Sequence, residues 1–176
     1  MFTFLPSAYW LGSKQKQPDA GIRPAQSHLP SIVLEVGDAE SLSQLQIDAR
    51  LWLEDMPEVS QLSPLLPLSG IHSLRLLQVQ LVILLSISPP IAPLPNFPRI
   101  IIQLWRGFPP HSPPCSPATQ QRQAHMVWEA DWTYAATPFY ILLSDIFRGP
   151  VPAAYGDHDR VHLDTVAWRQ AIIDAW

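Results

Sequence analysis

The strongest constraint on the fold lies in residues 30–55, PSIVLEVGDAESLSQLQIDARLWLED, where every local signal agrees. Residues 31–36 form a β-branched, apolar run between a proline and a glycine, which predicts a buried strand that carries one charge, Glu35. A helix is predicted directly afterwards, because Ser41 is a favourable N-cap residue with Gln44 three positions later. Apolar residues then recur at helical spacing. A lone carboxylate on such a strand indicates a strand–helix unit with a site at its end.

The length and composition predict one intracellular, soluble domain. The 176 residues are enough for one core, and 47% apolar with 15% charged residues is too hydrophobic for a disordered chain. The N-terminus lacks the basic region and apolar length of a signal peptide, and Arg75 with several prolines interrupts the most hydrophobic run, residues 74–94, so no membrane span is predicted. A net charge of −4 gives no global attraction to nucleic acid, so contact with DNA or RNA needs a local basic patch.

Proline dominates residues 57–117, which hold 13 of the 20 prolines and only four charged residues. Because proline removes a hydrogen-bond donor and fixes φ, regular structure is expected only in the gaps. Residues 79–87 and 99–105 are rich in Ile, Leu and Val and predict strands. We expect proline-rich insertions at about residues 57–77 and 106–123, which leave core segments at 9–56, 78–105 and 124–176.

The remaining segments complete an α/β pattern. Residues 1–12 predict an edge strand, and residues 12–24 predict a polar turn-like segment. Strands are predicted at residues 125–134 and 139–143, and a short helical turn at 144–147. A final helix is predicted at residues 163–176, with Asp164 or Thr165 as its N-cap. The expected fold is a central mixed sheet flanked by helices, with no internal repeat.

The order of elements around Asp19 and Glu35 resembles the restriction-endonuclease-like superfamily, the PD-(D/E)xK nucleases. The stretch PSIVLEVGDAESLSQLQIDARLWLE resembles the central motif of uncharacterised fungal members. KQPDAGIRP resembles the first acidic motif, VILLSI resembles the strand after the helix, and FYILLSDIFRG with VHLDTVAWRQAI is similar to the tail of such proteins. The resemblance implies that fold and hydrolysis of a phosphodiester bond with Mg²⁺, for which Mn²⁺ can substitute.

By residue, the resemblance implies that Asp19 and Glu35 are the two acids that hold the metal ion. The strand period of two residues puts position 37 on the same face as Glu35. The family pattern has a lysine there, and this chain has Gly37. Some superfamily members place that role on the following helix. Three polar residues are candidates for it: Gln44, Arg50 and, close to the first acid, Lys16.

Several alternatives remain open for these residues. Glu35 could reach solvent or pair with Arg23 or Arg50 without any catalytic role, and Asp19 could belong to an ordinary turn. The domain could then be an inactive relative that acts as a binding module. It could also be the product of a mispredicted gene, because the proline-rich segments resemble sequence inserted across a wrong exon boundary.

Other motifs predict less. His158 and His162 have the spacing of zinc ligands on a helix, but no third ligand of matching type accompanies them. The single cysteine, Cys115, excludes an internal disulfide and lies among prolines, which argues against a nucleophilic role. The proline-rich pieces could adopt polyproline II and dock SH3-type domains, but the basic residue that usually orients such peptides is absent beside them.

Overall fold

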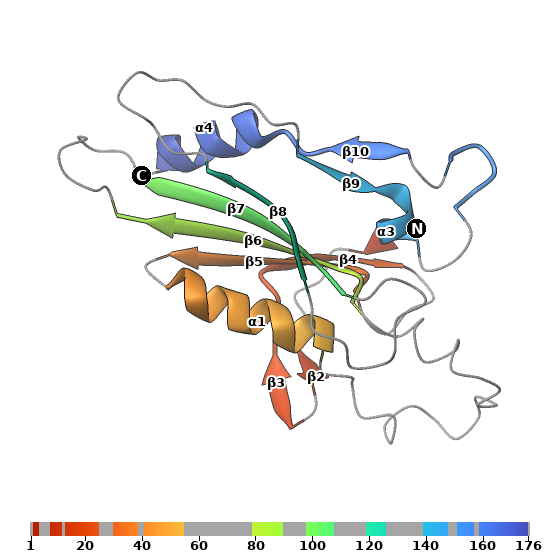
Figure 1. The fold of residues 1–176 in the computed structure, drawn as a ribbon, viewed down its shortest axis with the longest axis horizontal. Helices are drawn as coiled ribbons and strands as arrows, with labels where there is room; N and C mark the ends of the chain where they lie inside the picture. Colours follow the sequence, from red (N-terminus) through yellow and green to blue (C-terminus); the bar gives the residue numbers. More distant parts are fainter. Residues whose placement is uncertain are drawn as a thin grey trace.

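The computed structural model describes residues 2–3, 8–11, 13–24, 30–38, 41–54, 79–89, 98–107, 119–125, 139–147, 151–156 and 159–175. Together they form a mixed α/β structure around a six-stranded sheet (Figure 1). In order across the sheet, the strands are β1 (Phe2–Thr3), β4 (Ala20–Pro24), β5 (Ile32–Asp38), β6 (Leu81–Ser88), β7 (Arg99–Arg106) and β8 (Thr119–His125).

The other elements lie on the two faces of this sheet. Helix α1 (Leu42–Glu54) covers one face, with the hairpin β2 (Tyr9–Leu11) and β3 (Lys14–Lys16) beside it. The opposite face carries a second hairpin, the short helix α3 and helix α4, as Figure 1 shows. These elements are β9 (Tyr140–Leu142), β10 (Arg160–His162), α3 (Leu143–Ile146) and α4 (Thr165–Ala175).

Strand directions explain the position of α1. Strands β5 and β6 are parallel, in register from Ile32 opposite Leu81 to Asp38 opposite Ile87. Parallel neighbours need a crossover connection, and α1 lies in that connection. The other neighbouring pairs in the sheet are antiparallel. The chain therefore leaves the end of β5 and passes back over the sheet through α1.

Each face of the sheet has its own apolar core. On the α1 face, sheet residues pack against four buried helix residues: Leu45, Ala49, Trp52 and Leu53. On the opposite face, a second set of sheet residues packs under Phe139, Ile141 and Ile146. Both faces of the central strands are covered, which explains why β6 and β7 are apolar almost throughout.

Most of the regular structure agrees with the sequence. The strands expected at 31–36, 79–87 and 99–105 are β5, β6 and β7, and the central helix is α1. Ser41 caps α1, because its Oγ accepts a hydrogen bond of 3.2 Å from the Gln44 N–H. The final helix begins after Asp164, whose Oδ1 accepts from the Ala167 N–H at 2.9 Å.

Two segments differ from the prediction. Residues 12–24, expected as a turn-like segment, contain β3 and β4. Residues 106–123, expected as an insertion without regular structure, contain the end of β7 and most of β8. Strands β3 and β8 are rich in Lys and Gln and lie at sheet edges, where backbone pairing on one side suffices and no apolar run is needed. Of the expected strand 125–134, only His125 is described and it ends β8, whereas residues 126–134, like 57–77, lie outside the described residues, so that expectation is not tested.

Among the described residues, no helix combines the length and the apolar character that crossing a bilayer requires.

At Gly37 the side chain of Leu45 packs closely on the backbone of β5. A Cβ atom built on Gly37 would lie 2.7 Å from Leu45 Cδ1 and 3.0 Å from Leu45 Cγ. Leu45 is only 1% exposed, so its side chain has little space to withdraw. A side chain at position 37 would therefore force Leu45 to move from its place between α1 and the sheet.

This contact can be tested by a double-mutant cycle. Gly37→Ala should destabilise the protein by about 1–3 kcal/mol, because the added methyl overpacks the contact with Leu45. Leu45→Ala alone should cost about 2–5 kcal/mol through the cavity it leaves. In the double variant the methyl has room, so chemical denaturation should give a cost at least about 0.5 kcal/mol below the sum.

Gly156→Ala is the control, because its Cβ would meet Asp159 at an ordinary 3.4 Å. Strict additivity would contradict the assigned contact.

Candidate functional site

The hairpin β2–β3 brings a lysine onto the α1 face of the sheet. Lys16 pairs with Tyr9 across the hairpin, so the two side chains lie on the same side. Tyr9 is buried, and its ring meets that of Trp52 edge-on, with 5.8 Å between centroids and 72° between planes. This aromatic contact docks the hairpin on α1. Lys16 is thereby directed at the helix that covers β5.

Glu35 lies on β5 beneath α1 and is only 5% exposed. Its Oε1 accepts a hydrogen bond of 2.5 Å from Trp52 Nε1, and its Oε2 lies 3.4 Å from Lys16 Nζ. A buried carboxylate without partners would be costly, and here each oxygen has one. The cation on Glu35 is therefore Lys16, rather than Arg23 or Arg50.

Lys16 is shared between two acids. Its Nζ lies 2.7 Å from Asp48 Oδ2, closer than to Glu35. Asp48 and Trp52 are four residues apart on α1, so one face of the helix supplies both a carboxylate to Lys16 and an N–H to Glu35. Glu35, Lys16, Asp48 and Trp52 form one connected network, which we call the Glu35 network.

Asp19 lies next to this network. It precedes β4, and the pairing of Ala20 with Leu34 places position 19 beside Glu35 at the end of the antiparallel pair. The exposed Asp19 accepts a hydrogen bond of 2.7 Å on Oδ2 from the Val36 N–H. Its charge also acts on Glu35. The two acids singled out in the sequence are thus brought together from neighbouring strands.

Burial favours proton binding by the Glu35 carboxyl group. Burial raises the pKa of Glu35 to about 7, helped by the charge of Asp19 and opposed by Lys16 and by the Trp52 hydrogen bond. Burial would lower the pKa of Lys16, but the hydrogen bond to Asp48 and the charges of Glu35 and Asp48 outweigh it and raise that pKa. At neutral pH the site therefore holds a firmly charged ammonium next to an acid near its titration midpoint.

The two residues expected to assist from the helix have other surroundings. Gln44 is exposed in the first turn of α1, where its backbone N–H meets the Ser41 cap. Arg50 is exposed, and its guanidinium carbon lies 5.9 Å from the centroid of the Trp105 ring on β7. Of the three candidates for the lysine role, Lys16 is the one with a recorded contact to Glu35.

Two residues of the network were missed by sequence reasoning. Trp52 is one of the apolar residues that recur at helical spacing and predict only burial, and Asp48 is a polar residue of the same predicted helix. Their spacing of four residues was a usable signal, because it places both on one side of α1. The sequence does not show which side covers Glu35, however, since that depends on how the helix crosses the sheet.

Two carboxylates, those of Asp19 and Glu35, are the oxygen donors that lie near each other for a divalent metal ion. Mg²⁺ typically takes one or two carboxylates from a protein and keeps several waters, so Asp19 and Glu35 fit it. No cluster of three or more His, Cys, Asp or Glu that could hold a metal ion exists within the described ranges. Of the proposed zinc pair, His162 contacts the Tyr140 ring, and His158, like Cys115, lies outside those ranges.

The raised pKa of Glu35 predicts how stability depends on pH. Between about pH 4.5 and 7 the folded state binds more protons than the unfolded chain, so the free energy of unfolding falls as pH rises. Measured against Glu35→Gln across that window, wild type should lose up to about 3 kcal/mol, at about 1.4 kcal/mol per pKa unit. Asp38→Asn, at the exposed end of the same strand, serves as control. A difference that stays flat or grows with pH would contradict the assignment.

Comparisons with known proteins leave the family of this chain open. No family model, no curated protein and no solved structure matches it. The mixed α/β architecture and the Glu35 network therefore rest on the chain's own residues and contacts, and the restriction-endonuclease-like assignment rests on the motifs around Asp19 and Glu35.

Proposed function

We propose that the chain is a restriction-endonuclease-like domain that hydrolyses phosphodiester bonds with a divalent metal ion. In this proposal Asp19 and Glu35 hold Mg²⁺, and Lys16 supplies the ammonium group of the family pattern. The observation that carries the proposal is the meeting of two acids and one lysine at a single point. Lys16 comes from β3, Asp19 directly precedes β4, and Glu35 lies on β5. The position at which the family pattern has its lysine is occupied by Gly37.

The close contact at Gly37 supports this reassignment of the lysine. Leu45 fills the space that a side chain at position 37 would need, so an ammonium group must come from elsewhere. The hairpin provides it, because Lys16 Nζ lies 3.4 Å from Glu35 Oε2. The sheet also agrees with the proposed fold in outline, since an antiparallel β4–β5 pair carries the acids and α1 leads to a parallel β6.

The roles of the residues follow from their contacts. Asp19 and Glu35 supply oxygen ligands, and the Trp52 N–H fixes the orientation of the Glu35 carboxylate. Bound Mg²⁺ would neutralise phosphate charge and make a bound water more acidic. The Lys16 ammonium would stabilise the negative charge that develops on the phosphate oxygens. Neither Gln44 nor Arg50 is needed for these roles.

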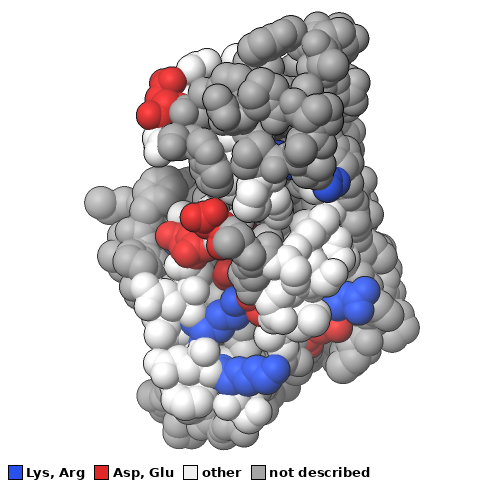
Figure 2. Space-filling view, turned by 90° about the vertical axis from the view of Figure 1, so that its left-hand side faces the viewer, with Lys and Arg blue, Asp and Glu red and all other residues white. Residues whose placement is uncertain are grey.

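A second candidate is a non-catalytic domain in which the same residues close the site. Lys16 lies nearer to Asp48 than to Glu35, and both Glu35 oxygens already have partners. The face drawn in Figure 2 shows acidic and basic side chains interspersed, with no continuous basic surface among the described residues. On this alternative Lys16 neutralises the acids permanently, and the domain serves as a binding module.

Substitution of the two lysines of β3 distinguishes these candidates. Calorimetric titration with Mg²⁺ and Mn²⁺ should detect binding to wild type and none to Glu35→Gln. Lys16→Met should keep metal binding while cleavage of single- or double-stranded DNA falls by about 10²-fold, as expected for loss of a charge-stabilising donor. Lys14→Met removes the same charge from an exposed position of the same strand and should leave both properties unchanged.

Two results would contradict the nuclease proposal. Absence of metal binding to folded wild type would remove it, with folding checked by circular dichroism. Metal binding that appears only in Lys16→Met would show that the lysine blocks the acids, and would favour the non-catalytic candidate.

A further inference from the structure

The hairpin β2–β3 presents an exposed aromatic side chain beside the proposed site. Tyr9 and Leu11 of β2 are buried, at 8% and 2% exposure, whereas Trp10 between them is 49% exposed. Because side chains alternate along a strand, Trp10 lies on the outer face of the hairpin while its two neighbours pack inward. The buried neighbours thus hold the indole ring at the surface, where a planar partner can contact it.

The same hairpin is locally basic. Its described residues, 8–11 and 13–16, include both lysines of the chain and no acidic residue. Lys14 is exposed and pairs with none of the described acids. Although the chain as a whole has a net charge of −4, the hairpin provides the local basic patch that attracts the phosphates of a nucleic acid.

The outer face of the hairpin is connected to the proposed site through one residue pair. Trp10 directly follows Tyr9, and Tyr9 pairs with Lys16. Lys16 Nζ in turn lies 3.4 Å from Glu35 Oε2. Gln15, the cross-strand partner of Trp10, is exposed on the same outer face. A nucleic-acid strand with a phosphate at Glu35 therefore runs beside the hairpin, where an indole ring and an amide group face it.

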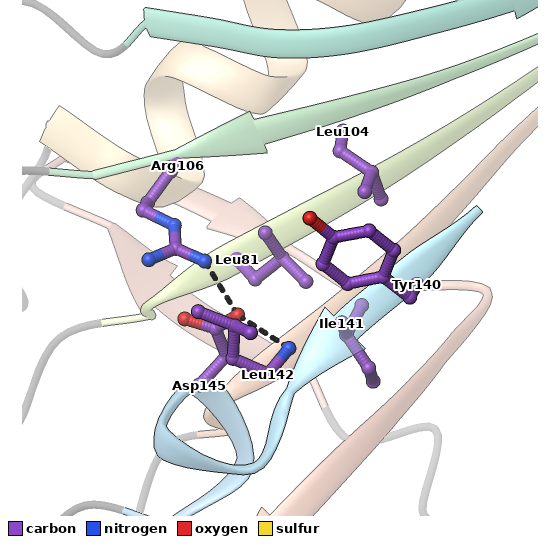
Figure 3. A pocket seen from close by; sticks show the side chains of 7 residues that line it. All are labelled: Leu81, Leu104, Arg106, Tyr140, Ile141, Leu142 and Asp145. Carbon is purple, nitrogen blue, oxygen red and sulfur yellow. Dashed lines mark hydrogen bonds and ion pairs between the residues drawn. The ribbon is translucent and has the colours of Figure 1, made fainter. Parts of the chain in front are cut away.

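A polar cluster at the end of β7 offers no comparable charge. Arg106 Nη2 donates to Asp145 Oδ2 at 2.6 Å, and the Leu142 N–H donates to the same oxygen at 3.1 Å. These residues line a cavity of about 260 Å³ on the opposite face of the sheet (Figure 3). The cation there is already paired with an acid that is only 5% exposed, so an anionic strand gains little from it.

From these features we propose that the domain binds single-stranded nucleic acid, with an unpaired base stacked on Trp10. The inference rests on the proposed nuclease function and names the class of its substrate. Stacking on an aromatic side chain strengthens binding by roughly 5- to 100-fold per base, whatever the base. In a duplex each base is already stacked and paired, so an unpaired base uses the indole ring at lower cost. With few cations on the hairpin, stacking supplies the larger part of the affinity.

The test measures DNA binding to the full chain by fluorescence anisotropy in EDTA, without metal ions. Three labelled probes of about 12 nucleotides are compared at one ionic strength: a single strand, the same backbone with abasic sites throughout, and the blunt duplex. The single strand should bind at least about fivefold more tightly than either other probe. Charge alone predicts the reverse order for the duplex, because its density of phosphate charge is higher.

Substitutions on the hairpin separate stacking from charge. Trp10→Ala should weaken binding of the single strand at least about fivefold and leave the abasic probe unaffected, whereas Trp10→Phe keeps a stacking ring and should bind close to wild type. Tyr155→Ala is the matched control, because Tyr155 is a 57% exposed aromatic residue outside the hairpin. Lys14→Met removes charge but no stacking surface, so it should weaken all three probes alike and leave cleavage at saturating DNA unchanged.

Four results would overturn the inference. They are no saturable binding of the single strand below about 1 mM, equal or tighter binding of the duplex, equal binding of the abasic probe, and undiminished binding of the single strand by a folded Trp10→Ala variant. The first three are measured on wild type, so a variant that fails to fold does not rescue the inference. Because the assay contains no metal ion, a domain that binds the single strand through Trp10 but binds no Mg²⁺ would contradict the nuclease and not the stacking site.

Discussion

The buried carboxylate of Glu35 is the constraint on which the α1 side of the structure depends. An acid between a helix and a sheet must be given partners, because burial without them costs several kcal/mol. The two partners come from different elements: Trp52 from α1 and Lys16 from β3. One side chain therefore specifies both how the helix is rotated on the sheet and where the hairpin docks. Burial raises the pKa of Glu35 against the opposing effect of these two contacts, and it does so beside an ammonium group whose own pKa is raised.

The opposite face repeats this arrangement with the charges exchanged between elements. There the sheet supplies the cation, Arg106, and the covering segment supplies the acid, Asp145. Both buried pairs are reinforced by an extra N–H donor, from Trp52 in one and from the Leu142 backbone in the other. Such reinforcement is needed because attraction between two buried charges rarely offsets their loss of hydration. The difference is that Arg106 Nε is buried without a hydrogen-bond partner among the described atoms.

The sequence predicts those elements whose structure is determined by neighbouring residues in the chain. Strands β5, β6 and β7 and helix α1 are encoded by apolar periodicity and by the Ser41 cap, and the sequence predicts them well. Strands β3 and β8 are polar edge strands whose pairing depends on neighbours distant in the chain, so no local pattern revealed them. Asp19 and Glu35 were found through motif order. Asp48 and Trp52 were not, because their role exists only once α1 lies over β5.

Under the proposed function, Lys16 would take the place of the lysine that the family pattern has at position 37. At position 37 the methyl groups of Leu45 occupy the space, so close helix packing and a lysine are mutually exclusive there. Lys16 lies on β3 and reaches Glu35 because its cross-strand partner, Tyr9, packs on Trp52. Trp52 in turn donates a hydrogen bond to Glu35. Removing that aromatic pair would therefore affect the cation and the acid together. Lys16 Nζ lies 2.7 Å from Asp48 Oδ2 and 3.4 Å from Glu35 Oε2. The relative strength of these two ion pairs decides whether the ammonium group serves a substrate or only closes the network.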